Sequence, residues 1–356
     1  MYLGTTTCKI TIAGKYVLRG VNSIEIKRSV HQVIQTAKVV LPLSVVMRND
    51  QLQTRIKLVD KIKEGDNIKL EFGYDGVHRT EFEGYIRRMN DSLPLELECE
   101  DELYLMRNVR LKESFKTISL RKLAALVLSR YNEQYGTNVV LYAGVPEMEL
   151  SKYQINDASG LDVLTDLKEK HLMCSYLTTV NGVKTLYVGL AYSLQKGVVK
   201  YALARNTIGK GDLKYAGSDT SRHKVVVVNK RRDGIIHKLF YDGTDFSTTD
   251  AAKVKGKKQK PETVAGDETK IELPGDLSDG YLKQLAKSAW LKSSTKGYKG
   301  GFETFLFPFS EPGTVALLSD PQFTGRGGRY FVGTVTTTFG VSGGRRKNEI
   351  DLKVSV

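Results

Sequence analysis

The C-terminal part of the chain carries the clearest alternation of apolar and polar positions, and this alternation predicts antiparallel strands. The pair Pro312-Gly313 signals a turn, and residues 314–318 then form a short apolar run. Residues 330–339 alternate as expected of a half-buried strand. Gly343 and Gly344 predict a turn into a last strand, residues 349–356.

A related pattern occurs near the other end of the chain. Residues 82–86 and 331–335 share Phe-x-Gly-x-(Ile/Val), and in both places an acidic residue and a glycine precede a short apolar strand and a polar turn. A glycine inside a strand marks a bend or a close approach of backbones, as at the corner of a small barrel. We therefore predict two related β-barrels, in residues 1–100 and 201–356.

Between these regions the apolar spacing changes to that of helices. Ser119 is a candidate N-cap for a helix that Gly136 ends. Ser159 and Asp162 predict a capping box for a second helix. The pair Asn181-Gly182 then predicts a β-hairpin. We expect a small α+β domain in residues 101–200.

Two further stretches lack a simple barrel pattern. Residues 46–59 look like an irregular connection. The valine run at 224–229 predicts a buried strand, and the polar stretch that follows predicts an insertion at about 242–300, with one helix at 278–292. The predicted fold class is α+β and mostly β.

Composition limits the class of protein. The chain has 356 residues, of which 40% are hydrophobic and 26% charged, which is typical of a folded chain with two or three domains. No apolar run approaches the roughly 20 residues of a membrane helix, and the N-terminus lacks the pattern of a signal peptide, so we expect synthesis in a cytoplasm. Cys8, Cys99 and Cys174 are far apart in sequence, which predicts buried free thiols.

The net charge of +14 raises the question of an acidic partner. The densest basic cluster lies in a polar segment without apolar periodicity, which predicts a solvated loop; contact with a polyanion is the alternative. The lysines of this cluster are Lys253, Lys255, Lys257, Lys258 and Lys260.

No catalytic, cofactor or metal motif appears in the sequence, and we expect no enzyme activity. The histidines lack metal-binding spacing, and His171 with Asp166 is the only pair that could act as an acid-base couple. Glu96, Glu98 and Glu100 share one face of a predicted strand, which we expect to be solvated. The glycine-rich segment 325–329 predicts a hairpin loop, with phosphate binding as the alternative.

Aromatic residues near predicted turns and strands are candidates for contacts between subunits. For Phe305, Phe307 and Phe309, packing in the core of a strand is the alternative. These candidates are Phe72, Tyr74, Phe82, Tyr85, Phe305, Phe307, Phe309 and Phe331.

The order of these regions resembles that of phage tail hub proteins of the late control family. The resemblance rests on Ser-Gly-Leu-Asp-Val-Leu at 159–164, on the Asn-Gly hairpin that ends in residues 186–189, and on the terminal motifs at 312–313, 328–332 and 336–340. It implies a homotrimeric ring in which two barrels per subunit occupy six similar positions around a channel.

The resemblance also implies partners and a location. These are a sixfold tail tube protein, a separate trimeric spike protein and other baseplate or distal tail proteins, in a phage tail or related injection particle assembled in the bacterial cytoplasm. DNA would pass through the channel without specific binding. Because the sequence stops at Val356, we expect no fused spike or hydrolase. The alternatives are a polyanion or carbohydrate binding protein that uses residues 253–260, and an enzyme that uses His171 and Asp166.

Overall fold

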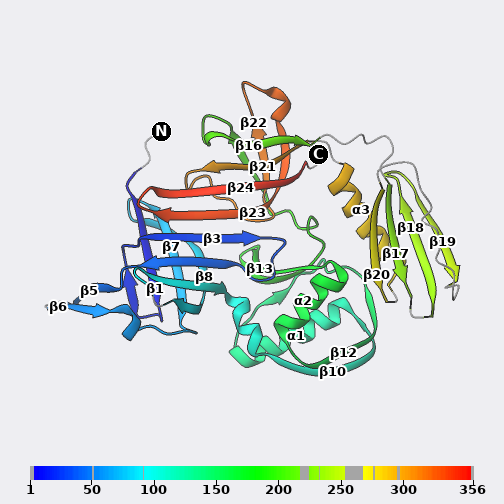
Figure 1. Cartoon of the computed structure of the whole chain (residues 1–356), viewed down its shortest axis with the longest axis horizontal. Helices are drawn as coiled ribbons and strands as arrows, with labels where there is room; N and C mark the ends of the chain where they lie inside the picture. Colours follow the sequence, from blue (N-terminus) through cyan, green and yellow to red (C-terminus); the bar gives the residue numbers. More distant parts are fainter. Residues whose placement is uncertain are drawn as a thin grey trace.

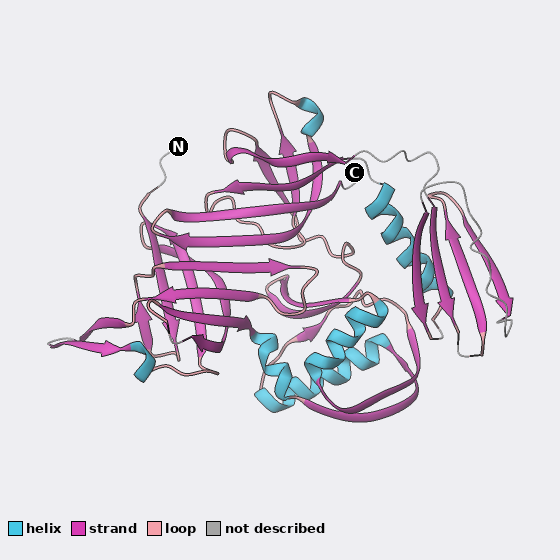
Figure 2. Cartoon of the chain, viewed as in Figure 1, coloured by secondary structure: helices cyan, strands magenta, loops and turns pink. Residues whose placement is uncertain are grey.

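The structure, a computed structural model, describes residues 4–49, 52–90, 92–216, 224–231, 233–252, 268–275, 277–294 and 297–353. Strands dominate and helices are few, so the predicted α+β, mostly β class is confirmed (Figures 1 and 2).

One sheet of thirteen strands contains the first and the last described strands of the chain (Figure 1). Its N-terminal strands are β1 (Thr6–Ile12), β2 (Tyr16–Leu18), β3 (Ser23–Ser29), β4 (Thr36–Leu41), β7 (Asn67–Tyr74), β8 (Val77–Asn90) and β9 (Leu95–Asp101). Its C-terminal strands are β15 (Val198–Ala202), β16 (Ile208–Ala216), β21 (Gly297–Thr304), β22 (Val315–Ser319), β23 (Gly328–Gly340) and β24 (Gly343–Lys353). Strand β3 pairs antiparallel with β23, and this ladder joins the two parts.

The two parts place their strands in the same spatial order. The N-terminal part runs β1-β7-β8-β9-β4-β3 and the C-terminal part runs β15-β22-β23-β24-β21-β16. The short strand β2 pairs with β1 alone among the described strands and has no counterpart in the C-terminal part. When β2 is set aside and the remaining six strands of each part are numbered along the chain, both orders read 1-4-5-6-3-2. The shared Phe-x-Gly motif lies in the fifth strand of each part, and both fifth strands bulge against the sixth. The first and fourth strands differ, because they pair antiparallel in one part and parallel in the other.

The prediction of two closed barrels is not confirmed. Among the described strands, no backbone pairing closes either part, and the β3–β23 ladder makes one open sheet of both. Side chains close the N-terminal part instead, because Leu306 and Phe339 from the C-terminal part complete its core. The ring of Phe339 stacks on Phe72 with centroids 4.7 Å apart. The close backbone approach predicted at Gly84 is present, since a Cβ there would lie 2.0 Å from the carbonyl oxygen of Glu100.

The middle of the chain folds as the local signals predict. Ser119 caps α1 (Leu120–Tyr135), and Gly136 ends it with φ of 61°. Ser159 and Asp162 form the capping box of α2 (Gly160–His171). Asn181 and Gly182 both have positive φ in the hairpin of β13 (Cys174–Val180) and β14 (Val183–Gly189). The other elements here are η2 (Glu102–Asn108), β10 (Arg110–Ser119), β11 (Val140–Leu141) and β12 (Glu149–Ser159).

A second, four-stranded sheet lies between β16 and β21 in sequence. Its spatial order is β19 (Phe246–Ala252), β18 (Ile235–Tyr241), β17 (Lys224–Lys230) and β20 (Glu268–Pro274), and α3 (Asp279–Ser294) packs against it. Residues of β17, β18 and α3 share one hydrophobic core with α1 and α2. This sheet begins at 224, before the position at which the insertion was predicted. The domain boundaries at 100 and 200 stay predictions.

Two sequence predictions fail in the main sheet region. Residues 46–59 do not form an irregular connection, because β5 (Ser44–Asn49) and β6 (Leu52–Lys57) make a hairpin that projects from the sheet, followed by the 3₁₀ helix η1 (Leu58–Asp60) (Figure 1). The last strand begins at Gly343 rather than 349. Its inward positions include Arg346 and Asn348, both fully buried, so the sequence lacks the apolar alternation that marks a strand.

Candidate assembly site

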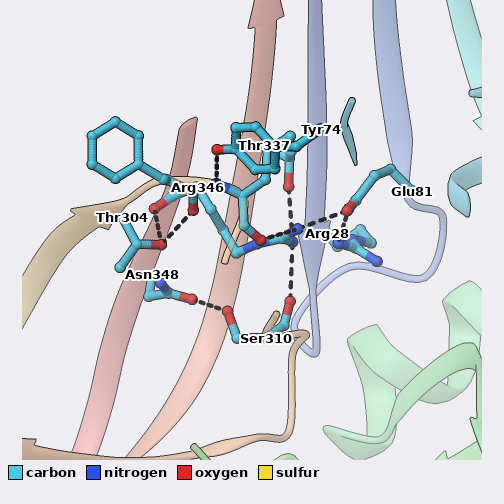
Figure 3. A network of polar contacts seen from close by, with 10 residues as sticks. Arg28, Tyr74, Glu81, Thr304, Ser310, Thr337, Arg346 and Asn348 are labelled. Carbon is cyan, nitrogen blue, oxygen red and sulfur yellow. Dashed lines mark hydrogen bonds and ion pairs between the residues drawn. The ribbon is translucent and has the colours of Figure 1, made fainter. Parts of the chain in front are cut away.

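Arg346 lies where the N-terminal and C-terminal parts meet, and it is the largest fully buried side chain of the described residues. Its guanidinium donates to Glu81 Oε1 at 2.7 Å, to the carbonyl of Ser310 at 3.1 Å and to Thr337 Oγ1 at 3.2 Å (Figure 3). These partners come from β8, from the loop between β21 and β22, and from β23. One side chain therefore ties together three segments that are distant in sequence.

The carboxylate of Glu81 lies between two guanidinium groups. Its second oxygen accepts a hydrogen bond from Arg28 of β3 at 3.2 Å. Burial lowers the pKa of Arg28, and the charge of Glu81 partly offsets this effect. We call Arg28, Glu81 and Arg346 the buried ionic junction. Because charges removed from water are tolerated only when they are paired, each member needs the others.

The loop between β21 and β22 is fastened to this junction. The ring of Phe309 faces two guanidinium groups. The central carbon of the Arg79 guanidinium is 3.3 Å from the ring centroid, and that of the Arg346 guanidinium is 4.7 Å from it. Cations over aromatic faces attract the ring quadrupole. The hydroxyl of the next residue, Ser310, donates to Asn348 of β24 (Figure 3).

An apolar surface lies at one end of the N-terminal strands, which we call the apolar end surface. It consists of Tyr74, Val77, Phe305, Phe307 and Val341, of which Val77 is 79% exposed, Phe307 50% and Val341 98%. The rings of Tyr74 and Phe307 are 5.9 Å apart, and Phe305 packs under the guanidinium of Arg345. Exposed apolar groups that gather in this way are typical of contact surfaces between proteins.

A second polar joint links the main sheet to the α+β region. Asp101 at the end of β9 accepts hydrogen bonds from the backbone N–H groups of Gln35 and Leu103, and it caps η2. Burial raises the pKa of Asp101 to about 7, although the two N–H groups favour its charged form.

No family model matches this sequence, and no curated protein matches it. Solved structures do resemble it. A tail protein from Neisseria meningitidis MC58 has a TM-score of 0.60 at 13% identity, with 97% of this chain and 96% of that chain covered. The 43 kDa tail protein of prophage MuSo2 from Shewanella oneidensis has a TM-score of 0.59 at 12% identity, covering 97% and 98%. The chain has the fold of phage tail proteins.

A secretion-system protein shares this fold. An E. coli component of the type VI secretion system, described as structurally similar to tail proteins of bacteriophage T4, has a TM-score of 0.56 at 11% identity. It covers 98% of this chain, and 77% of that protein is matched. These identities are low, so the shared property is the fold of the whole chain.

The predicted interface residues have different positions in the structure. Phe72, Phe82 and Phe331 are nearly fully buried, so their side chains fill cores of this chain. Tyr85 is half-buried and stacks on Tyr104 with centroids 5.7 Å apart. Phe309 is covered by arginines. Tyr74, Phe305 and Phe307 lie at the apolar end surface, where the interface prediction stays open to test.

The other candidate sites have plain structural outcomes. The carboxylate face of β9 is not fully solvated, because Glu100 is 4% exposed and binds Arg87 at 3.0 Å and Arg107 at 2.7 Å. The glycine-rich segment forms the connection from β22 to β23, with the short helix η4 (Thr324–Arg326). Arg326 is paired there with Asp320 at 3.4 Å. The basic cluster at 253–260 lies outside the described residues.

His171 and Asp166 line one cleft but do not act as a pair in the described structure. Asp166 accepts from Tyr153 at 3.2 Å and from Lys170, and no hydrogen bond joins it to His171 within the described residues. Burial lowers the pKa of His171. Across the described ranges, no three acidic, histidine or cysteine side chains could hold a metal ion. No helix there is long and apolar enough to cross a membrane.

Proposed function

We propose that this protein is a structural subunit of a phage tail or a phage-tail-like injection machine, and that it forms a homotrimeric ring. The observation that carries the proposal is the repeated strand order within one chain, in a fold shared over the whole chain with tail proteins. Three copies would supply six repeats around an axis. The ring would then match a hexameric tail tube on one face and a trimeric spike on the other.

The joint between the repeats supports this proposal. A ring with near-sixfold geometry requires a fixed relation between the two repeats of each subunit, because contacts between subunits close a ring only at a defined rotation. The β3–β23 ladder and the buried ionic junction hold the repeats in one sheet. Among the described strands, the four-stranded insertion belongs to the C-terminal repeat. Around the ring, repeats with and without this insertion would therefore alternate, which gives the ring threefold symmetry where a trimeric partner binds.

The proposed partners are a tail tube protein, a separate spike protein and other baseplate or distal tail proteins. The particle would be assembled in the bacterial cytoplasm, and DNA would pass through the ring without specific binding. The role is mechanical rather than enzymatic. The apolar end surface is the proposed contact with a neighbouring component, because its exposed side chains come from hairpin tips and a loop rather than from an internal core.

Mass measurement and electron microscopy of the purified chain test this proposal together. We expect a trimer of the 39.7 kDa chain and threefold rings with a central hole. A double variant, Phe307→Ser with Val341→Ser, should weaken assembly while each chain stays folded. Leu93→Ser is the matched control, since Leu93 is 80% exposed but lies in a different hairpin. A chain that stays monomeric at micromolar concentration and yields no ring images contradicts the proposal.

A further inference from the structure

A cleft of about 450 Å³ separates the α+β region from the four-stranded sheet. One wall is β12 with the end of α2, and the other is formed by Lys230, Arg231 and residues after β20. The two walls are tied together at their base, where Tyr281 donates to the carbonyl of His171 and Ser278 donates to that of Glu147. The cleft is therefore a fixed feature and is separate from the apolar end surface.

Strand β12 offers a free backbone edge to this cleft. It pairs only with β10 among the described strands, so its other edge lacks a partner strand. Residues 149–154 and Asn156 all line the cleft. Because consecutive residues of a strand point to opposite faces, this lining indicates that the cleft runs along the edge of β12 and not over one face. Lys152 and Asp157 have positive φ and interrupt the extended backbone, so residues 153–156 form the stretch of edge between them. Residues 153–155 of this stretch are in register with β10, and the register shifts between Ile155 and Ala158. An unpaired edge of this kind is a template for an added strand.

The walls carry an excess of cationic side chains. Lys152, Lys170, Lys230 and Arg231 line the cleft, against Glu149 and Asp166. Lys152 has no ion-pair partner among the described residues. The other three pair with Asp166, Glu272 and Asp279, all at partly exposed positions where ion pairs are weak. Cations that face one another across a cleft attract an anion into it.

The wall at the end of α2 contains an unused polar group. His171 is 7% exposed, and its Nδ1 has no hydrogen-bond partner. A buried ring nitrogen without a partner costs free energy, which a bound ligand would recover. Because burial lowers the pKa of His171, it offers a neutral donor or acceptor rather than a further charge.

We propose that this cleft binds an extended acidic segment of a partner protein, which adds as a strand beside residues 153–156 of β12. Main-chain hydrogen bonds to the free edge give the segment its direction, and its carboxylates lie among the lysines and arginine of the two walls. The cleft shares no lining residue with the apolar end surface, so the binding test does not depend on the outcome of the assembly test.

Binding of a fluorescein-labelled peptide of alternating Glu and Val to the full-length protein tests this proposal. We expect saturable binding by fluorescence anisotropy and none for a peptide of alternating Lys and Val. The double variant Lys152→Glu/Lys230→Glu should weaken binding by about tenfold or more, because it reverses one charge on each wall. The matched control Lys27→Glu/Lys214→Glu changes two exposed lysines of the main sheet and should bind as the unchanged protein does.

Hydrogen exchange separates strand addition from charge attraction alone. The amides of residues 153–156 should exchange more slowly when the Glu-Val peptide is bound. Three results would overturn the proposal: no binding of the Glu-Val peptide, equal binding by the Lys152→Glu/Lys230→Glu variant, or binding without slower exchange in residues 153–156.

Discussion

Removal of the charge on Glu81 should destabilise the fold more than any surface substitution. The variant Glu81→Gln leaves Arg346 fully buried without its counter-ion, and it also weakens the bond to Arg28. Two charge-assisted hydrogen bonds are affected, each worth about 1.5 to 3 kcal/mol. Loss of one partner of a buried ion pair costs about 3 to 5 kcal/mol in general. Whether the loss is reckoned from the hydrogen bonds or from the buried ion pair, it is a large share of the roughly 5 to 15 kcal/mol of unfolding free energy that is typical of folded proteins.

Urea unfolding followed by far-ultraviolet circular dichroism measures this loss. Fluorescence of the single tryptophan, Trp290, is less suitable because it lies on α3, away from the junction. The surface pair of Lys38 and Glu96 provides a control, since Glu96→Gln removes an ion pair of 2.8 Å at an exposed position and should cost much less.

A double-mutant cycle shows whether the loss comes from the pair. Arg346→Met alone should also destabilise, because it leaves Arg28 as the only partner of Glu81. The double variant Glu81→Gln/Arg346→Met should cost less than the sum of the single variants, by about 1 to 3 kcal/mol. A loss below about 1 kcal/mol for Glu81→Gln, or additive single effects, would refute the view that this pair joins the two repeats.

Three further predictions concern single residues. Gly84→Ala should strongly lower the midpoint of urea unfolding, because the added Cβ would meet the backbone of Glu100. Gly20→Ala is the control and should have little effect, since the space around Gly20 is open. Equal midpoints for the two variants would contradict this prediction. The free energy of unfolding should fall as pH rises from about 4 to about 7, because folded Asp101 keeps its proton up to a pKa of about 7 while the unfolded group loses its proton near 3.8. Urea unfolding at several pH values in this range measures the dependence. The variant Asp101→Asn should lose the share of the dependence that Asp101 contributes. Burial raises the pKa of Cys99 to about 12, so its thiol should resist iodoacetamide at pH 8 until urea unfolds the chain. Mass spectrometry follows the labelling. Rapid labelling of the folded protein would show that the thiol is accessible.

Local signals predicted local structure well. The cap at Ser119, the capping box at Ser159 and the turn at Asn181-Gly182 each depend on a few neighbouring residues, and each occurs where the sequence placed it. The shared Phe-x-Gly motif also pointed to equivalent strands, since β8 and β23 hold the same place in the two repeats.

Long-range features were harder to predict from the sequence. Barrel closure depends on which strands meet, and the pairing of β3 with β23 joins residues about three hundred positions apart in the chain. The early start of β24 was missed because Arg346 occupies an inward position, where Glu81 neutralises its charge. The burial of Glu100 was missed for the same reason, since its arginine partners are contributed partly by β8 and partly by η2. The sequence pattern reports polarity, but it does not report the partner that neutralises a charge.

The shared core of α1, α2, β17 and α3 has a consequence for biosynthesis. Apart from Val33, its buried apolar residues come from two stretches of chain, 103–190 and 225–286, and strands β15 and β16 of the main sheet lie between them in sequence. During translation, α1 and α2 would therefore emerge from the ribosome before Tyr281 and Leu282, which complete the same core, have been synthesised. During that interval the nascent chain exposes an incomplete apolar face, and chaperone occupancy should peak there and decline once α3 has left the exit tunnel.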